Sequence, residues 1–198
     1  MTTPTKPARR RSRSGGGSAK ARRSAARLAA VQALYQIELA GAAPEAVLSE
    51  FVKHRLGHEV DGVSYVAADP VLFSVIVRGA SERRADIDAM LSAALDAKMP
   101  LERLELLLRA ILRAGAFELL GQADTHPRII LAEYIEVTKA FYAGRESGVI
   151  NGVLDHLARR LRPDELEPQA NTPYPPDARA AKAGPPDSDP HNTDDDDG

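Results

Sequence analysis

Residues 100–120 read Pro-Leu-Glu-Arg-Leu-Glu-Leu-Leu-Leu-Arg-Ala-Ile-Leu-Arg-Ala-Gly-Ala-Phe-Glu-Leu-Leu. Their apolar side chains recur every three or four positions, which is the spacing of one face of an α-helix. Proline is favoured at the first position of a helix, so we expect a helix that begins at Pro100. Its buried stripe is expected to contain Leu101, Leu104, Leu107, Leu108, Ile111, Leu112 and Leu119.

The same spacing recurs through the middle of the chain, and no stretch shows the alternation of a half-buried strand. Ala and Leu dominate while β-branched residues are sparse, which favours helix. Asp69-Pro70 combines a capping residue with a proline, as helix starts often do. We therefore predict an all-α bundle of six or seven helices. They are expected near 20–40, 44–57, 70–97 with a bend at Gly79, 100–120, 127–141 and 146–161.

The two ends of the chain carry opposite charge. Residues 1–27 contain nine Lys and Arg and no acidic residue, whereas residues 163–198 contain ten Asp and Glu against Arg179 and Lys182. Both ends are poor in apolar residues and rich in Gly, Ser or Pro, which predicts disorder. We expect a basic tail at 1–19, one folded domain at 20–162 and a Pro-rich acidic tail at 163–198.

Composition excludes several kinds of chemistry. Cysteine is absent, so disulfides, Cys metal ligands and Cys nucleophiles are excluded. The five histidines show no metal-ligand spacing, and no Ser–His–Asp order, phosphate loop or carboxylate pair stands out. No apolar run approaches the ~18 residues of a membrane span. We predict a cytoplasmic protein that is not an enzyme, has no cofactor or metal centre and does not enter a membrane.

Three stretches resemble the NusB family of bacterial transcription antitermination factors. They are Arg27-Leu-Ala-Ala-Val-Gln-Ala-Leu-Tyr35, the run from Leu101 through Leu108-Arg-Ala-Ile-Leu-Arg-Ala-Gly-Ala-Phe-Glu-Leu-Leu120, and the run from Leu131 to Ile150-Asn-Gly-Val-Leu-Asp155. The resemblance covers about residues 22–161 and neither tail. It implies a fold of two packed three-helix bundles and no enzymatic activity.

The resemblance also implies partners. NusB-like proteins bind the boxA element of single-stranded RNA in ribosomal RNA leader transcripts together with NusE, a small-subunit ribosomal protein. The complex joins other Nus factors on RNA polymerase and suppresses termination. The family contains monomers and homodimers, so the oligomeric state stays open.

Candidate RNA-binding residues lie at the start of the first helix. Lys20, Arg23 and Arg27 are spaced three and four apart, so we expect them to share one exposed stripe with Arg22 to its side. Cations on a helix can neutralise RNA phosphates. Gln32 matches the family's glutamine in this helix, and it either reads a base edge or is a polar residue at the rim.

A second candidate group lies in the connection before the last helix. Tyr142 and Arg145 are expected to be exposed and to bind RNA by stacking and by charge. Phe141 is expected in the core, with RNA stacking as the alternative. Ser147 either contacts RNA or caps the last helix. For Asn151 and Gly152 we predict a structural role, in which Gly152 allows a backbone to approach closely and Asn151 bonds a neighbouring segment.

Other functions and roles stay open at this point. The first alternative is a protein-interaction scaffold of the same fold without intrinsic RNA binding. An RNA-modifying enzyme or an architectural DNA-binding protein are further alternatives, although no Gly-rich cofactor motif is present. The acidic tail either keeps the protein soluble or mimics RNA and competes for the basic head.

Overall fold

The computed structural model describes residues 17–56, 66–121 and 124–166. These residues belong to one compact unit that ends at Leu166, and they form helices without any strand in the described ranges. The all-α prediction is confirmed. Most of the basic tail and the acidic tail from residue 167 onward lie outside the described residues.

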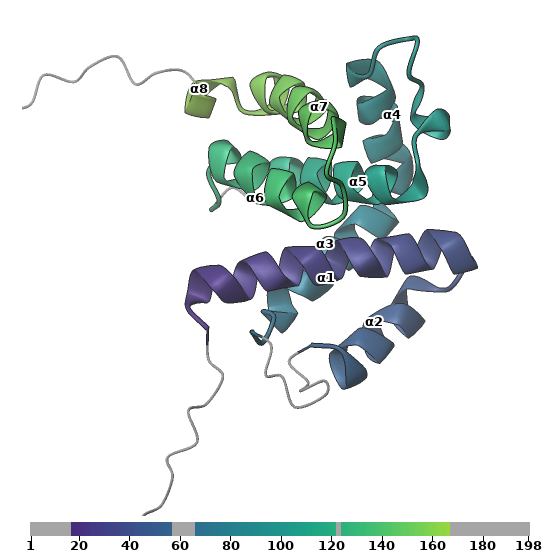
Figure 1. The fold of residues 1–198 in the computed structure, drawn as a ribbon, viewed down its shortest axis with the longest axis vertical. Coiled ribbons are helices and arrows are strands. Elements are labelled where there is room, and N and C mark those ends of the chain that lie inside the picture. Colours follow the sequence, from purple (N-terminus) through teal and green to yellow (C-terminus); the bar gives the residue numbers. More distant parts are fainter. Residues whose placement is uncertain (1–16, 57–65, 122–123, 167–198) are drawn as a thin grey trace, which may run out of the picture. The chain divides into compact units, whose positions relative to one another are not determined.

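The first two helices begin and end close to their predicted positions. Helix α1 (Ala19–Ala40) ends at Gly41, whose φ of 61° is the left-handed conformation that glycine adopts without strain. Helix α2 (Pro44–His54) follows with proline in its first turn. Figure 1 shows α1 crossing the molecule, with α2 on one side and α5, α6 and α7 on the other.

The predicted long helix at 70–97 is two helices. Helix α3 (Pro70–Glu82) begins as expected, because the Asp69 carboxylate accepts hydrogen bonds from the backbone N–H groups of Val71 and Leu72. Helix α4 (Arg84–Ala94) follows after Arg83, which leaves the helical conformation with φ −98° and ψ 19°. The helix is therefore interrupted at Arg83, and the predicted bend at Gly79 is wrong.

The helix predicted from Pro100 begins six residues later. Leu101–Arg103 form a short 3₁₀ helix, η1, and Leu104 is extended with φ −69° and ψ 146°. Helix α5 runs from Leu106 to Gly121. The apolar residues before Leu106 continue the helical spacing but belong to a separate turn, in which Leu101 is buried.

The remaining helices match the sequence more closely. Helix α6 (Pro127–Lys139) is capped by His126, whose ring nitrogen accepts from the Arg128 N–H group. Helix α7 (Glu146–Leu161) agrees with the predicted 146–161. A four-residue helix, α8 (Pro163–Leu166), follows. The described fold thus continues past the boundary that we expected at 162.

Helix α5 is at the centre of the bundle. It contacts α1 and α3 on one side and α4, α6 and α7 on the others. All residues from Ala110 to Leu119 are buried, so this helix has no solvent-facing side over that stretch. Within the described helices, none is both long and apolar enough to cross a membrane.

Two glycines lie where large side chains of other helices pack against them. A Cβ at Gly79 of α3 would lie 2.0 Å from Cζ of Phe117 in α5. A Cβ at Gly115 of α5 would lie 2.8 Å from Leu154 Cδ1 in α7. Close packing that we expected at Gly152 therefore occurs at Gly79 and Gly115. Gly152 is exposed, and a Cβ there would meet no atom within 4 Å.

We predict opposite effects of alanine at the packed and the open glycine. Gly79→Ala overpacks the core against Phe117, which costs about 1–3 kcal/mol and exceeds the gain in helix propensity. Gly152→Ala has only that gain and should raise the free energy of unfolding by about 0.5–1 kcal/mol. Urea denaturation of both variants measures the difference. Equal changes of the same sign would contradict this packing.

Candidate nucleic-acid interface

The Arg27 side chain points into the protein. It is only 3% exposed, and its Nε and Nη2 donate to the two carboxylate oxygens of Glu118 at 2.7 and 3.1 Å. Its Nη1 donates to Glu133 at 3.3 Å. Burial alone would lower the pKa of Arg27, but the hydrogen bond and charge of Glu118 raise it. The prediction that Arg27 shares an exposed stripe with Lys20 and Arg23 is wrong.

This ion pair fixes how α1 sits on the rest of the bundle. Arg27 belongs to α1, Glu118 to α5 and Glu133 to α6, so one guanidinium joins three helices. The fully buried Tyr134 lies against the same group, and burial together with the Glu118 charge raises its pKa well above the usual value. The rotation of α1 about its own axis is therefore set by a buried contact.

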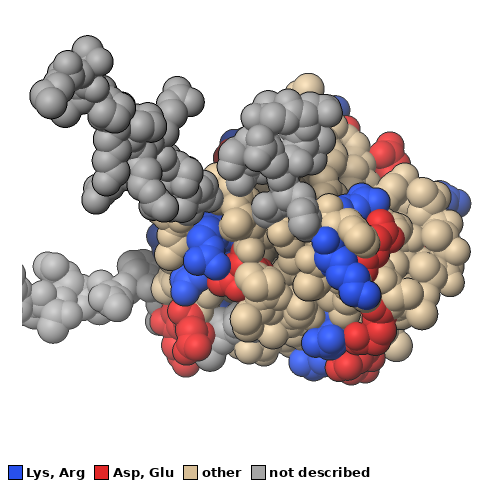
Figure 2. Space-filling view, turned by 90° about the horizontal axis from the view of Figure 1, so that it is seen from below, with Lys and Arg blue, Asp and Glu red and all other residues tan. Residues whose placement is uncertain are grey.

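The other cations at the start of α1 face solvent. Lys20, Arg22 and Arg23 are exposed. Among the described residues, neither Lys20 nor Arg23 has a carboxylate within salt-bridge distance. Figure 2 shows that on the face seen from below, Lys and Arg side chains lie beside Asp and Glu rather than in one continuous basic surface. The exposed cations Lys20, Arg22 and Arg23 are therefore a local feature of the first turns of α1.

A shallow groove with a volume of ≈ 370 Å³ runs beside these cations between α1 and α6. Lys20, Ser24 and Leu28 line it from α1, and Val137 and Ala140 line it from α6. Residues four apart are neighbours on a helix surface, so the exposed Gln32 continues the row 20, 24, 28. From Lys20 to Gln32 this row is about 18 Å long at 1.5 Å per residue.

Carboxylates also border this groove. Glu133 and Glu136 line it from α6. Glu133 accepts from Arg27, and Glu136 accepts from the Lys139 ammonium at 2.7 Å. Both charges are therefore largely balanced within the protein.

The connection between α6 and α7 begins at the groove-lining Ala140. Phe141 is 39% exposed, so its predicted place in the core is wrong. Tyr142 was expected to be exposed but is half-buried near Tyr35, and its hydroxyl donates to Glu105 at 2.9 Å. Burial, and then this hydrogen bond, raise the pKa of Tyr142 above its usual value. Arg145 is exposed, as expected.

The structure excludes capping by Ser147, which leaves RNA contact as the alternative, and contradicts the prediction for Asn151 and Gly152. Arg145 occupies the cap position without a side-chain hydrogen bond, so Ser147 does not cap the helix. Asn151 and Gly152 are both exposed, so the predicted close backbone approach at Gly152 is wrong. Among the described residues, the Asn151 side chain makes no hydrogen bond to a neighbouring segment, so its predicted role is wrong as well. The last helix is instead held by its buried side, which contains Ile150, Val153, Leu154 and Leu157.

The sequence did not single out several residues that shape this region. Ser24 and Leu28 line the groove, and their signal was the spacing of four from Lys20. Arg128 and the 53% exposed Ile129 lie beside Lys20 at a second hollow, and no local pattern marks them. No cluster of metal-binding side chains occurs in the ranges that the structure describes.

Comparison with known proteins gives a consistent result. A family model described as the NusB family matches residues 24–159. The chain is 47% identical over 148 residues to a transcription antitermination protein NusB of Bradyrhizobium sp. (strain ORS 278), covering 75% of this chain and 88% of that protein. It is 48% identical over 144 residues to the NusB of Maricaulis maris, covering 73% and 90%.

Solved structures show the same fold. T. maritima NusB is similar with a TM-score of 0.60 and 27% identity, over 74% of this chain and 97% of that one. A crystal structure of the antitermination factors NusB and NusE in complex with dsRNA is similar with a TM-score of 0.59 and 22% identity, over 70% and 96%.

We predict that the buried Arg27 pair is far more important for stability than an exposed pair. Glu118→Gln leaves the guanidinium without its main partner and should lower the free energy of unfolding by about 3–5 kcal/mol. The matched control is Asp155→Asn, which weakens the exposed pair of Asp155 and Arg159 and should cost less than about 1 kcal/mol. Urea denaturation measures both. Similar losses would show that the Arg27 pair is not a structural centre.

Proposed function

The chain belongs to the NusB family of transcription antitermination proteins, and we propose that it binds boxA-type single-stranded RNA of ribosomal RNA leader transcripts together with NusE. Association with other Nus factors and RNA polymerase is part of this proposal. The proposed activity is binding, and it requires no catalytic residue, cofactor or metal.

Known relatives support the choice of partners. A NusB of the same fold is described in complex with NusE and double-stranded RNA. The relatives with 46–48% identity are transcription antitermination proteins. Their alignments cover 88–94% of the relatives' own length, so this chain has nearly the whole of the domain on which the proposal depends.

The observation that carries the RNA proposal is the position of the exposed cations. Lys20 lies at one end of the α1–α6 groove, with Arg23 and Arg22 on the adjoining turn of α1. Phe141 is exposed and directly follows Ala140, which lines the same groove, and the exposed Arg145 belongs to the same connection. Single-stranded RNA needs phosphate neutralisation and faces on which bases stack. This region offers both within one surface.

The number of exposed cations determines how strongly salt is expected to weaken RNA binding. If Lys20, Arg22, Arg23 and Arg145 each neutralise a phosphate, the logarithm of the binding constant falls with the logarithm of salt at a slope of about −3 for a single strand. Arg27 has no place in this set, because its charge is used inside the protein. Gln32 and Tyr142 stay candidates for contacts with bases.

One observation favours a second candidate function. Acidic and basic side chains are intermixed on the surface seen in Figure 2, and two glutamates border the groove. Such a surface also suits a protein partner, so the alternative is a scaffold that binds NusE and leaves RNA contacts to it. Titration of the purified chain with boxA RNA alone distinguishes the two. A scaffold would bind only after NusE is added.

We predict that Lys20 and Arg23 contact phosphates. Lys20→Gln with Arg23→Gln should weaken boxA binding about 10- to 30-fold at 0.1 M salt and reduce the salt slope by about 1.4. The matched control is Lys53→Gln with Lys98→Gln, which removes two exposed cations from other surfaces. Fluorescence anisotropy across a salt series measures affinity and slope. Equal behaviour of the two double variants would contradict the assignment.

We also predict that Phe141 stacks on a base. Phe141→Ala should cost about 1–3 kcal/mol of binding free energy for single-stranded boxA, with little change in the salt slope. Val52→Ala, at another exposed apolar residue, is the control and should leave binding unchanged. Duplex RNA of the same sequence tests the mode of binding, because paired bases offer no free face. A loss that is equal for duplex and single strand would contradict stacking.

A further inference from the structure

A second hollow shares Lys20 with the α1–α6 groove and is the more basic of the two. Its volume is ≈ 500 Å³, and it lies between the start of α1 and the start of α6. Four basic and two acidic residues line it, namely Lys20, Arg23, Arg27, Arg128, Asp124 and Glu133. The groove has Lys20 against Glu133 and Glu136. Because Arg27 and Glu133 bond to each other, the hollow keeps three cations against one carboxylate.

The hollow and the groove are continuous along α6. Ile129 and Ala132 line the hollow, Val137 and Ala140 line the groove, and Glu133 lines both. Residues three and four apart share one side of a helix, so a single side of α6 borders both spaces. From Ile129 to Ala140 this side is about 17 Å long at 1.5 Å per residue. A strand that lies in the groove can therefore reach the hollow without leaving this surface.

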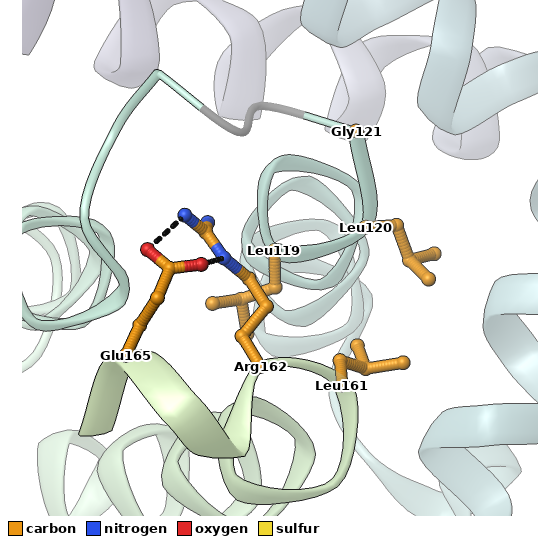
Figure 3. Close-up of a pocket in the computed structure, with 6 residues that line it drawn as sticks. All are labelled: Leu119, Leu120, Gly121, Leu161, Arg162 and Glu165. Atoms are coloured by element: carbon orange, nitrogen blue, oxygen red, sulfur yellow. Dashed lines mark hydrogen bonds and ion pairs between the residues drawn. The ribbon is translucent and has the colours of Figure 1, made fainter. Parts of the chain in front are cut away.

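The Arg128 guanidinium is held in position beside the hollow. Its Nη2 donates to the backbone oxygen of Leu166 at 3.3 Å, and the Leu166 side chain is buried. Arg162 supports the same turn, because it bonds the Glu165 carboxylate (Figure 3) and donates to the Thr125 oxygen at 2.9 Å. Among the described residues, Arg128 has no carboxylate within salt-bridge distance. Its charge is therefore positioned but not balanced by an ion pair.

The hollow also has an apolar part. Ile129 is 53% exposed, and the exposed Ala132 lies three residues further along α6. A nucleotide combines a phosphate, which suits the cations, with a base whose face can cover apolar side chains. An anion without a base would leave Ile129 in water. The volume falls within the range of about 300–1,000 Å³ that is usual for ligand pockets.

We propose that this hollow binds one unpaired nucleotide of the RNA, with Arg128 at its phosphate and Ile129 against its base. The proposal rests on the proposed function, because the strand passes from the α1–α6 groove across Lys20 into the hollow. Arg128 then adds a fifth phosphate contact to the four cations proposed above.

A mononucleotide tests the hollow without boxA RNA. Cytidine monophosphate at millimolar concentration should shift the amide NMR signals of Ile129 and Ala132 in the full-length protein, and the shifts should saturate. Inorganic phosphate and cytidine each lack one half of the ligand and should shift these signals less at the same concentration. Amides of Ser49 and Lys53 in α2, which do not line the hollow, serve as the reference.

Two results of this titration would overturn the proposal. Shifts that are equal for inorganic phosphate and cytidine monophosphate would show that the hollow attracts anions and has no place for a base. Signals of Ile129 and Ala132 that move no more than the α2 reference would show that no nucleotide binds there.

The salt dependence of RNA binding tests the phosphate contact. For boxA RNA with a few unpaired nucleotides on each side, Arg128→Gln should weaken binding about fivefold at 0.1 M salt and reduce the salt slope by about 0.7. Arg160→Gln removes an exposed cation of α7 outside the hollow and should change neither. Loss of the bond to Leu166 alone would lower affinity equally at every salt concentration. An unchanged slope would therefore refute the contact.

The base contact is tested with Ile129→Ala, which should weaken binding of the same RNA about two- to fivefold without changing the slope. Leu39→Ala, at a 61% exposed residue outside the hollow, is the control and should bind normally. Replacing each base in turn by an abasic site locates the nucleotide. At one position the abasic RNA should bind the Ile129→Ala variant and the unaltered protein equally, because both changes remove the same contact. If no position behaves in this way, the proposal fails.

The results separate this proposal from the proposed function. If boxA RNA does not bind the unaltered protein, the proposed function fails, while the mononucleotide titration still decides whether the hollow takes a nucleotide. If boxA RNA binds and neither Arg128→Gln nor Ile129→Ala weakens it more than its control, the proposed function stands and the nucleotide site is refuted. Loss of NusE binding on Arg128→Gln, with RNA binding unchanged, would assign the hollow to a protein partner and also overturn the proposal.

Discussion

The arrangement of this surface depends on one buried ion pair. Arg27 is held by Glu118 from α5 and Glu133 from α6, and removing one member of such a pair leaves a charge in a place that water does not reach. Because Arg27 faces inward, the rest of α1 has no freedom to rotate. Lys20, Arg22 and Arg23 are thereby turned outward, and Ser24 and Leu28 are turned toward α6. A contact in the core thus determines which cations are available to a partner.

Local signals in the sequence predicted the helices. The directions of individual side chains depend on partners that are distant in the sequence, and these directions were not predicted. The capping residues Gly41 and Asp69 placed helix ends correctly because a cap acts on its own few neighbours. The inward direction of Arg27 was not predictable from spacing. Its main partner is Glu118, 91 positions later, and only the packing of α1 on α5 brings the two together.

Contacts between distant parts of the sequence also explain why some predicted helix ends and packing residues differ from the structure. Spacing of apolar residues continues smoothly through Arg83 and through Leu104, yet the chain turns at both places because successive helices pack in different directions. Gly152 looked like a packing residue, but Gly79 and Gly115 have that role since they face large side chains of other helices. Phe141 follows the α6 spacing but lies past the end of that helix. For the site, Lys20, Arg22, Arg23 and Arg145 were correctly expected to be exposed, while their proposed contacts with RNA still depend on experiment.

The two ends of the folded region meet at the start of α6. Lys20 near the beginning of α1 and Arg128 of α6 line one hollow, and Arg128 also binds the backbone of Leu166. Chain ends that lie close together generally permit circular permutation, so joining residue 166 to residue 18 by a short linker should preserve the bundle. The same closeness means that a segment attached directly at residue 18 or at residue 166, such as a purification tag on a shortened chain, begins near the same surface. The charge of a segment attached at either of these two points therefore contributes to the surroundings of Lys20 and Arg128.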